Sequence, residues 1–199
     1  MTSPPPAASE DPARVRRLLL DQLTFHYEGH LRPKLAGMSD EEYLFEPVPG
    51  CWSIRARAQA RSPMAGGAGD IVCDFAWPEP DPPPFTTIAW RLAHVSIGIF
   101  AMRAAWHFAG PAVSYQSATY PPHAADALNL LDESYTRWVQ GIAGLDDDSL
   151  FDPVGDTEPF LAGAPMAEIV VHVNREAIHH LAEVLVIRDL WRNRQAWGA

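Results

Sequence analysis

A long apolar helix is predicted by the sequence PMAEIVVHVNREAIHHLAEVLVIRDLW at residues 165–191. With about 3.6 residues per turn, its branched apolar side chains gather into one stripe, and His180 lies in the middle of that stripe. Glu176 lies one turn before His180, just beside the stripe. Because a buried imidazole or carboxylate without a partner costs several kcal/mol, something must satisfy both groups. The spacing leaves two interpretations open, a metal ion or hydrogen bonds to neighbouring helices.

Three earlier segments show the same helical spacing of apolar residues, at about residues 11–33, 86–110 and 122–142. Thr86 or Thr87 is expected to cap the second segment, because a threonine hydroxyl accepts hydrogen bonds from the free amides at a helix start. The second segment is apolar on most sides, which is typical of a central helix. Four helices that share one core predict an all-α fold, a four-helix bundle.

The chain of 199 residues suits one domain, expected over residues 11–199 after a disordered, proline-rich tail over residues 1–10. Between the first two helices, residues 44–85 lose helical periodicity because proline and glycine recur. Residues 53–57 and 71–75 are expected to pair there as a small β-hairpin. A link of this length allows the bundle a crossover topology instead of a plain up-and-down arrangement.

Composition excludes several classes of partner. The formal net charge is −10, with only 15 Lys and Arg, so phosphate backbones and anionic membrane surfaces would repel the chain. Nucleic acid and membrane are therefore not expected partners. The two cysteines, Cys51 and Cys73, are too few for a disulfide framework, and the first residues lack the pattern of a signal peptide. We expect a cytoplasmic protein with reduced thiols.

A third inward ligand is expected from another helix, and His94 in the middle of the second helix is the leading candidate. Gly98 and Ala101 follow on the same face and are small enough to leave room beside it. A lone histidine there is more often a satisfied core residue. Together with Glu176 and His180, however, His94 would complete a three-ligand site with an open position, the pattern of catalytic metal sites.

Two more side chains of the last helix are candidates for a supporting role. His172 lies one turn before Glu176 and is the alternative ligand. Glu183 lies beside the face of His180 and is a candidate to orient its imidazole from behind, although a solvated glutamate is the commoner outcome.

Three residues elsewhere are candidates for the pocket wall. His26 falls on the apolar side of the first helix and is a candidate to line the pocket or support a ligand. Trp52 and Trp90 are candidates to pack over the site, and structural packing alone is the alternative interpretation for both.

The chain resembles the DinB-like family in three segments, PVPGCWSIR at 47–55, TTIAWRLAHV at 86–95 and HVNREAIHHLAEVLVIRDLW at 172–191. The resemblance implies a bundle with crossover topology, often dimeric, and a divalent metal held by one histidine of the second helix and two ligands four residues apart on the fourth. His94 matches the first position and His180 the last. Glu176 stands at the remaining position, where the family usually has histidine. A carboxylate is a competent ligand for zinc, nickel or manganese.

The family includes mycothiol- and bacillithiol-dependent S-transferases and maleylpyruvate isomerase. The resemblance therefore implies a metal-dependent enzyme, a thiol-dependent S-transferase or isomerase that acts on a small electrophile, with mycothiol as co-substrate and a homodimer as the assembly. Two alternatives stay open from the residues. One is a non-catalytic binding or dimerisation module with a buried polar network, and the other is a metal-dependent hydrolase with the same ligands.

Overall fold

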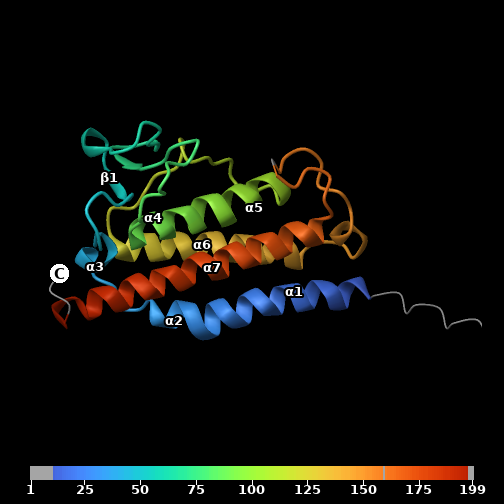
Figure 1. Ribbon diagram of the computed structural model, residues 1–199. Helices are drawn as coiled ribbons and strands as arrows, with labels where there is room; N and C mark the ends of the chain where they lie inside the picture. The colour runs from blue at the N-terminus through green and yellow to red at the C-terminus, as the bar shows by residue number, and fades with distance from the viewer. Residues whose placement is uncertain (1–10, 159, 197–199) are drawn as a thin grey trace, which may run out of the picture.

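The computed structural model describes residues 11–158 and 160–196, and this part of the chain is mainly helical (Figure 1). The all-α bundle predicted from the sequence is confirmed. The expected tail over residues 1–10 lies outside the described residues, and the extent of the domain stays a prediction. Within the described part, no helix is both long enough and apolar enough to cross a membrane.

Four helical rods form the bundle, and the first two rods each contain a π-helical segment. The first rod comprises α1 (Pro12–His26), η1 (Tyr27–Leu31) and α2 (Arg32–Lys34), the second rod comprises α4 (Ile88–Ala93), η3 (His94–Ala101) and α5 (Met102–His107), the third is α6 (Ala124–Ala143) and the fourth is α7 (Met166–Arg192). Short elements outside the rods are α3 (Asp40–Tyr43), η2 (Arg57–Gln59), η4 (Asp148–Leu150) and η5 (Arg194–Ala196).

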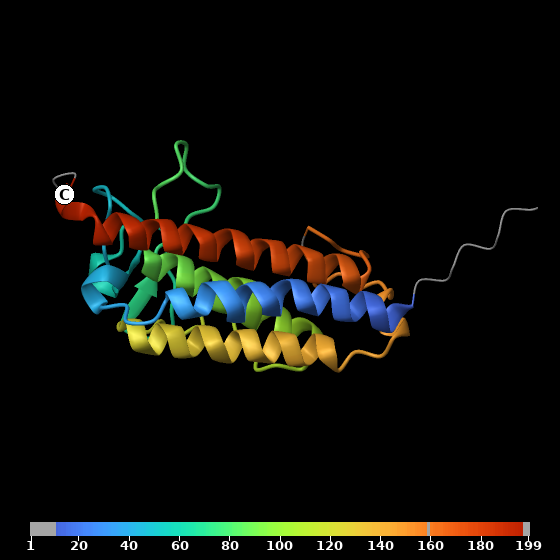
Figure 2. The ribbon, with the colours of Figure 1, turned by 90° about the horizontal axis from the view of Figure 1, so that it is seen from below.

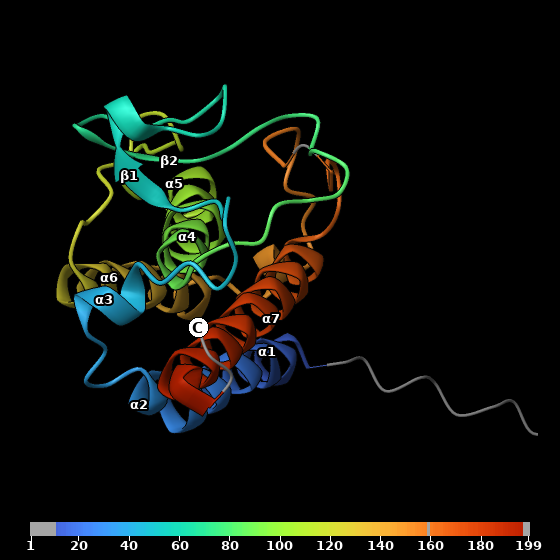
Figure 3. The same cartoon turned by 60° about the vertical axis from the view of Figure 1, so that its left-hand side comes forward.

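The first and second rods lie diagonally across the bundle. The first rod packs against α6 and α7, and the second rod packs against the same two helices from the other side (Figure 3). The second rod and α6 run in the same direction, so the connection over residues 108–123 returns along the length of the bundle (Figures 1 and 2). The crossover topology is thereby confirmed, and it brings α4, η3 and α7 side by side.

Helix starts follow the capping residues in the sequence. The Asp11 side chain accepts from the Ala13 amide at the start of α1. The Thr87 hydroxyl accepts from the Trp90 amide, so Thr87 is the cap of α4. Because each cap satisfies an amide that the first helical turn leaves free, these residues fix where the helices begin.

The predicted hairpin is present in the connection between the first two rods. β1 (Ile54–Ala56) and β2 (Ile71–Cys73) pair in antiparallel fashion. Asp74, which is fully buried, follows β2, and its carboxylate accepts from the Ser53 amide, the Arg55 guanidinium and the Arg61 amide. One carboxylate therefore holds three parts of this connection together.

A buried ion pair fixes the C-terminal half of α7 against the segment that follows the first rod. Arg188 is 1% exposed, and its Nε donates to Glu42 Oε1 at 2.7 Å. The same guanidinium also donates to the backbone carbonyls of Lys34 and Ala36. These hydrogen bonds compensate the cost of burying the charges, and they hold α7 in one position relative to the other rods.

Candidate functional site

His94 is the first residue of the π-helical segment η3, in the middle of the second rod. Within η3 the backbone hydrogen bonds span five residues, as shown by the Met102 amide, which donates to the Ile97 carbonyl. The Arg103 side chain donates to the Gly98 carbonyl. Such wide turns occur frequently at functional sites, because they change the direction of the side chains around them.

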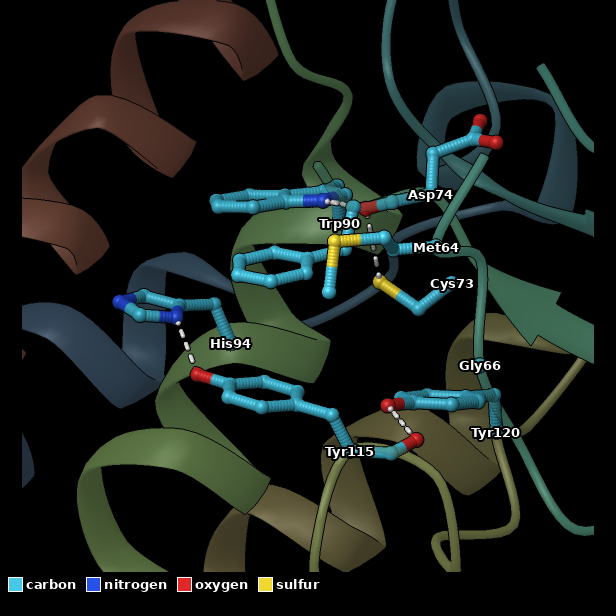
Figure 4. A pocket seen from close by; sticks show the side chains of 9 residues that line it. Met64, Gly66, Cys73, Asp74, Trp90, His94, Tyr115 and Tyr120 are labelled. Carbon is cyan, nitrogen blue, oxygen red and sulfur yellow. Dashed lines mark hydrogen bonds between the residues drawn. The ribbon is translucent and has the colours of Figure 1, made fainter. Parts of the chain in front are cut away.

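The His94 imidazole is held on one face and on one edge. The Trp90 ring lies over its face, with ring centroids 5.2 Å apart and planes 16° from parallel. The Tyr115 hydroxyl lies 2.8 Å from Nδ1 of His94 (Figure 4). Burial lowers the pKa of His94 to about 3, and the nearby His180 and Arg91 act in the same direction. His94 is therefore neutral at pH 7, with a proton on one ring nitrogen only.

His180 approaches His94 from α7, in an edge-to-face arrangement with ring centroids 4.8 Å apart. Its Nε2 lies 3.5 Å from Glu176 Oε2, and its Nδ1 lies 2.8 Å from Glu183 Oε2. Burial lowers the pKa of His180, although the adjacent Glu183 acts in the opposite direction. His180 thus lies close to both His94 and Glu176, and Glu183 contacts its Nδ1 side.

Arg91 lies next to His180 on the α4 side. Its Nη1 is 3.0 Å from His180 Nδ1 and 2.9 Å from Glu183 Oε2. Burial lowers the pKa of the Arg91 guanidinium, and Glu183 offsets part of that effect. A positive charge therefore lies on the Nδ1 side of His180, away from Glu176.

The potential ligand atoms of His94, Glu176 and His180 do not all lie within 4.8 Å of one another. Among the described residues, one group of three has all its potential ligand atoms within 4.8 Å of one another, and it consists of His179, His180 and Glu183. The Arg91 guanidinium already occupies the space beside Glu183 and would repel a second cation. The Nε2 side of His180, where Glu176 lies, is therefore the more favourable side for a metal ion.

A family profile described as the DinB superfamily matches residues 68–184, more than half of the chain. The chain belongs to the DinB superfamily. Members of this superfamily are generally metal-binding proteins. No curated protein and no solved structure matches the chain significantly. The matched range of the DinB profile includes His94, Glu176 and His180.

Four other predicted residues of this DinB-superfamily protein lie near the three predicted ligands. Glu183 contacts His180, Trp90 stacks on His94, and Trp52 lies behind Trp90 with ring centroids 6.1 Å apart. His172 Nδ1 lies 3.8 Å from Glu176 Oε1, at the partly exposed rim. Glu183, Trp90 and His172 therefore each lie next to one of the three predicted ligands, and Trp52 lies one ring further away.

His26 lies elsewhere in the DinB bundle. It is on α1, diagonally across from the rod that carries His94, and its ring lies 6.0 Å from that of His30. Within the described residues, no hydrogen bond, ion pair or ring contact joins His26 to His94, Glu176 or His180. The structure does not bring it to the candidate site, and its role in the pocket stays a prediction.

A small cavity of about 70 Å³ lies beside His94 in this DinB fold (Figure 4). Most of its wall is apolar or aromatic. The lining residues are Met64, Gly66, Cys73, Asp74, Phe75, Trp90, His94, Tyr115 and Tyr120. Burial raises the pKa of the Cys73 thiol, so this cysteine is not an activated nucleophile.

Sequence reasoning missed Tyr115 and Arg91. The space that Gly98 leaves beside His94 was expected to be open, but the Tyr115 hydroxyl fills it. A Cβ atom at Gly98 would lie 1.8 Å from that hydroxyl oxygen. Gly98, one turn after His94, was the available signal, although it does not identify the side chain that enters the space.

Proposed function

We propose that this protein is a divalent-metal-dependent enzyme in which His94, Glu176 and His180 hold the ion. The observation that carries the proposal is the 3.5 Å distance between His180 Nε2 and Glu176 Oε2. Neutral His180 has one N–H, and Glu183 at 2.8 Å is a good acceptor for it on Nδ1. Nε2 and the Glu176 carboxylate are then two acceptors that face each other, and a cation between them would satisfy both.

The chemistry of the donor set fits a divalent ion. Two imidazoles and one carboxylate suit zinc, nickel or manganese and leave coordination positions open. A carboxylate behind one imidazole, as Glu183 stands behind His180, is the usual support for a metal-bound histidine. Zinc, nickel and manganese are therefore the ions to test.

We further propose a thiol-dependent S-transferase or isomerase reaction on a small electrophile, with a mycothiol-type co-substrate. Resemblance to the DinB-like family supports this step. A divalent ion at the site would lower the pKa of a thiol and so supply the reactive thiolate at neutral pH. Trp90 and Tyr115 keep water away from the inner side of His94, and Arg91 provides a fixed positive charge beside His180. A homodimer is the proposed assembly.

Metal analysis of protein purified without a histidine tag tests the ligand set. The wild-type protein is expected to contain a divalent ion at near one equivalent, and His94→Ala and His180→Ala are expected to lose it. His179→Ala is the matched control, because His179 belongs to the alternative group and its side chain is 63% exposed. Loss of metal in His179→Ala with retention in His94→Ala would place the ion at the alternative group and refute the proposed ligands.

A second candidate is a non-catalytic binding or dimerisation module, and the contact of Arg91 with His180 favours it. If Arg91 donates to Nδ1 of His180, the single N–H of His180 is on Nε2 and points to Glu176, which gives a closed polar network without an ion. Thermal unfolding separates the two candidates. Zinc, nickel or manganese raises the melting temperature of a metal site by mass action and leaves a closed network unchanged.

The proposed reaction has a separate test, because a metal-dependent hydrolase would use the same ligands. The metal-loaded protein is incubated with thiols and electrophiles, and in parallel with simple esters and amides. Thiol consumption with formation of a thioether supports the transferase. Turnover of esters or amides alone would show a hydrolase instead.

A further inference from the structure

We infer that Tyr115 is a positioning residue that fixes the ring orientation and the tautomer of His94. The inference rests on the proposed metal site. The Tyr115 hydroxyl oxygen lies 2.8 Å from His94 Nδ1, and the two ring planes differ by only 3°. The two rings are stacked and offset, with centroids 6.2 Å apart. The Tyr115 hydroxyl therefore occupies Nδ1 of His94, and the Tyr115 ring lies parallel to the imidazole.

The protein makes a specific space for this hydroxyl group. Gly98 lies one turn after His94, and a Cβ atom there would be 1.8 Å from Tyr115 Oη and 2.7 Å from Cζ. Real Cβ atoms essentially never approach other atoms so closely. The hydroxyl reaches His94 only because residue 98 is glycine.

Tyr115 is held in place by contacts other than His94. The Tyr120 hydroxyl donates to the Tyr115 backbone carbonyl at 2.8 Å, and the Phe75 ring lies parallel to the Tyr115 ring with centroids 5.9 Å apart. Gly66 packs closely against the same carbonyl. Because the connection over residues 108–123 sets the position of Tyr115, the tyrosine positions the histidine.

These contacts leave one edge of the His94 imidazole for a metal. Trp90 covers a face, and its own Nε1 is anchored to the Asp74 carbonyl at 2.7 Å. Tyr115 occupies the Nδ1 edge, and the His180 ring on α7 lies edge-to-face with the His94 ring at a centroid distance of 4.8 Å. We assign the Nδ1 proton to the hydrogen bond with Tyr115 and the lone pair of Nε2 to the ion, the arrangement found in metal sites where a histidine is supported from behind.

The test compares Tyr115→Phe with Tyr43→Phe. Tyr43 is the matched control, because its buried hydroxyl also donates one hydrogen bond, to the Pro121 carbonyl away from His94. Zinc affinity is measured by competition with a chromophoric chelator. We expect Tyr115→Phe to bind zinc roughly 10- to 100-fold more weakly than wild type, and Tyr43→Phe to bind as wild type does. If wild type binds zinc, equal zinc affinity in Tyr115→Phe and wild type would overturn the inference.

A second measurement keeps this inference separate from the metal proposal. Nitrogen NMR of the metal-free protein reports which ring nitrogen of His94 carries the proton. We expect Nδ1–H in wild type and a shift toward Nε2–H in Tyr115→Phe. If wild type binds no zinc but shows this shift, the metal proposal fails and the positioning role stands. A proton on Nε2 in wild type, or the same tautomer in both proteins, overturns the positioning role.

Discussion

Substitution of Gly98 by alanine is the most direct perturbation of the His94 environment. The added methyl group would lie 1.8 Å from Tyr115 Oη, 2.7 Å from Cζ and 3.3 Å from His94 Nδ1. Either Tyr115 or η3 must therefore move. Movement of the tyrosine breaks its hydrogen bond with His94 and leaves two buried polar groups unpaired.

The free-energy change combines three effects. Overpacking of a core costs about 1–3 kcal/mol, and an unpaired buried hydrogen-bonding group costs about 1–3 kcal/mol. Replacement of a helical glycine by alanine returns only about 0.5–1 kcal/mol. Gly98→Ala is therefore expected to lower the free energy of unfolding by about 1–5.5 kcal/mol. For a chain of this size, each kcal/mol lowers the melting temperature by about 2–4 °C.

Urea denaturation of the metal-free protein, followed by circular dichroism, measures this loss. Gly29→Ala is the matched control, since Gly29 also lies in a π-helical segment, η1, and a Cβ atom there would meet open space among the described residues. That variant is expected to be as stable as wild type or slightly more stable. Equal stability of Gly98→Ala and Gly29→Ala would refute the close packing of Tyr115 against η3.

Three further predictions concern other contacts. Arg188→Ala leaves Glu42 as a buried unpaired charge, so the free energy of unfolding in urea should fall by about 3–5 kcal/mol. Glu183→Ala removes the carboxylate behind His180, and zinc affinity measured by chelator competition should fall roughly 10- to 100-fold. In Asp40→Asn, the melting temperature should fall less steeply than in wild type as the pH is lowered. The amide at the start of α6, followed by the adjacent imidazole, lowers the pKa of Asp40, so the carboxylate contributes stability above the ordinary carboxyl pKa and loses it as the pH falls.

Each of these predictions has a control. Arg192→Ala should change stability little, because the Arg192 side chain is 53% exposed and comes no closer than 4.0 Å to the Glu42 carboxylate, the outer limit of an ion pair. Glu168→Ala, an exposed residue of α7, should leave zinc affinity unchanged. If the melting temperature of Asp40→Asn decreases below about pH 4 as steeply as that of wild type, the assigned role of the carboxylate is contradicted.

The bundle could be predicted from sequence because each helix carries local signals. Apolar spacing indicated the rods, Thr86 or Thr87 marked the start of α4, and the short segments at 53–57 and 71–75 predicted the hairpin of β1 and β2. The π-helical segments could not be predicted in the same way. The second rod is apolar on most sides, so a change in helical pitch leaves no visible change in its pattern.

The candidate site was only partly predictable. His180, Glu176 and Glu183 share one helix, where spacing alone determines their proximity. Tyr115 comes from an aperiodic connection, and its approach to His94 depends on how that connection returns along the bundle. Sequence reasoning can indicate a space at a glycine, but long-range topology determines what fills it.

Asp74 has a consequence for redesign of the loops. Its side chain joins three parts of the connection, whereas its main-chain carbonyl accepts from the Trp90 indole that covers His94. Loop shape and the aromatic cover of the histidine therefore depend on one residue and cannot be altered independently. A library that varies the connection around the cavity beside His94 should keep this aspartate constant and randomise outward-facing positions on the hairpin.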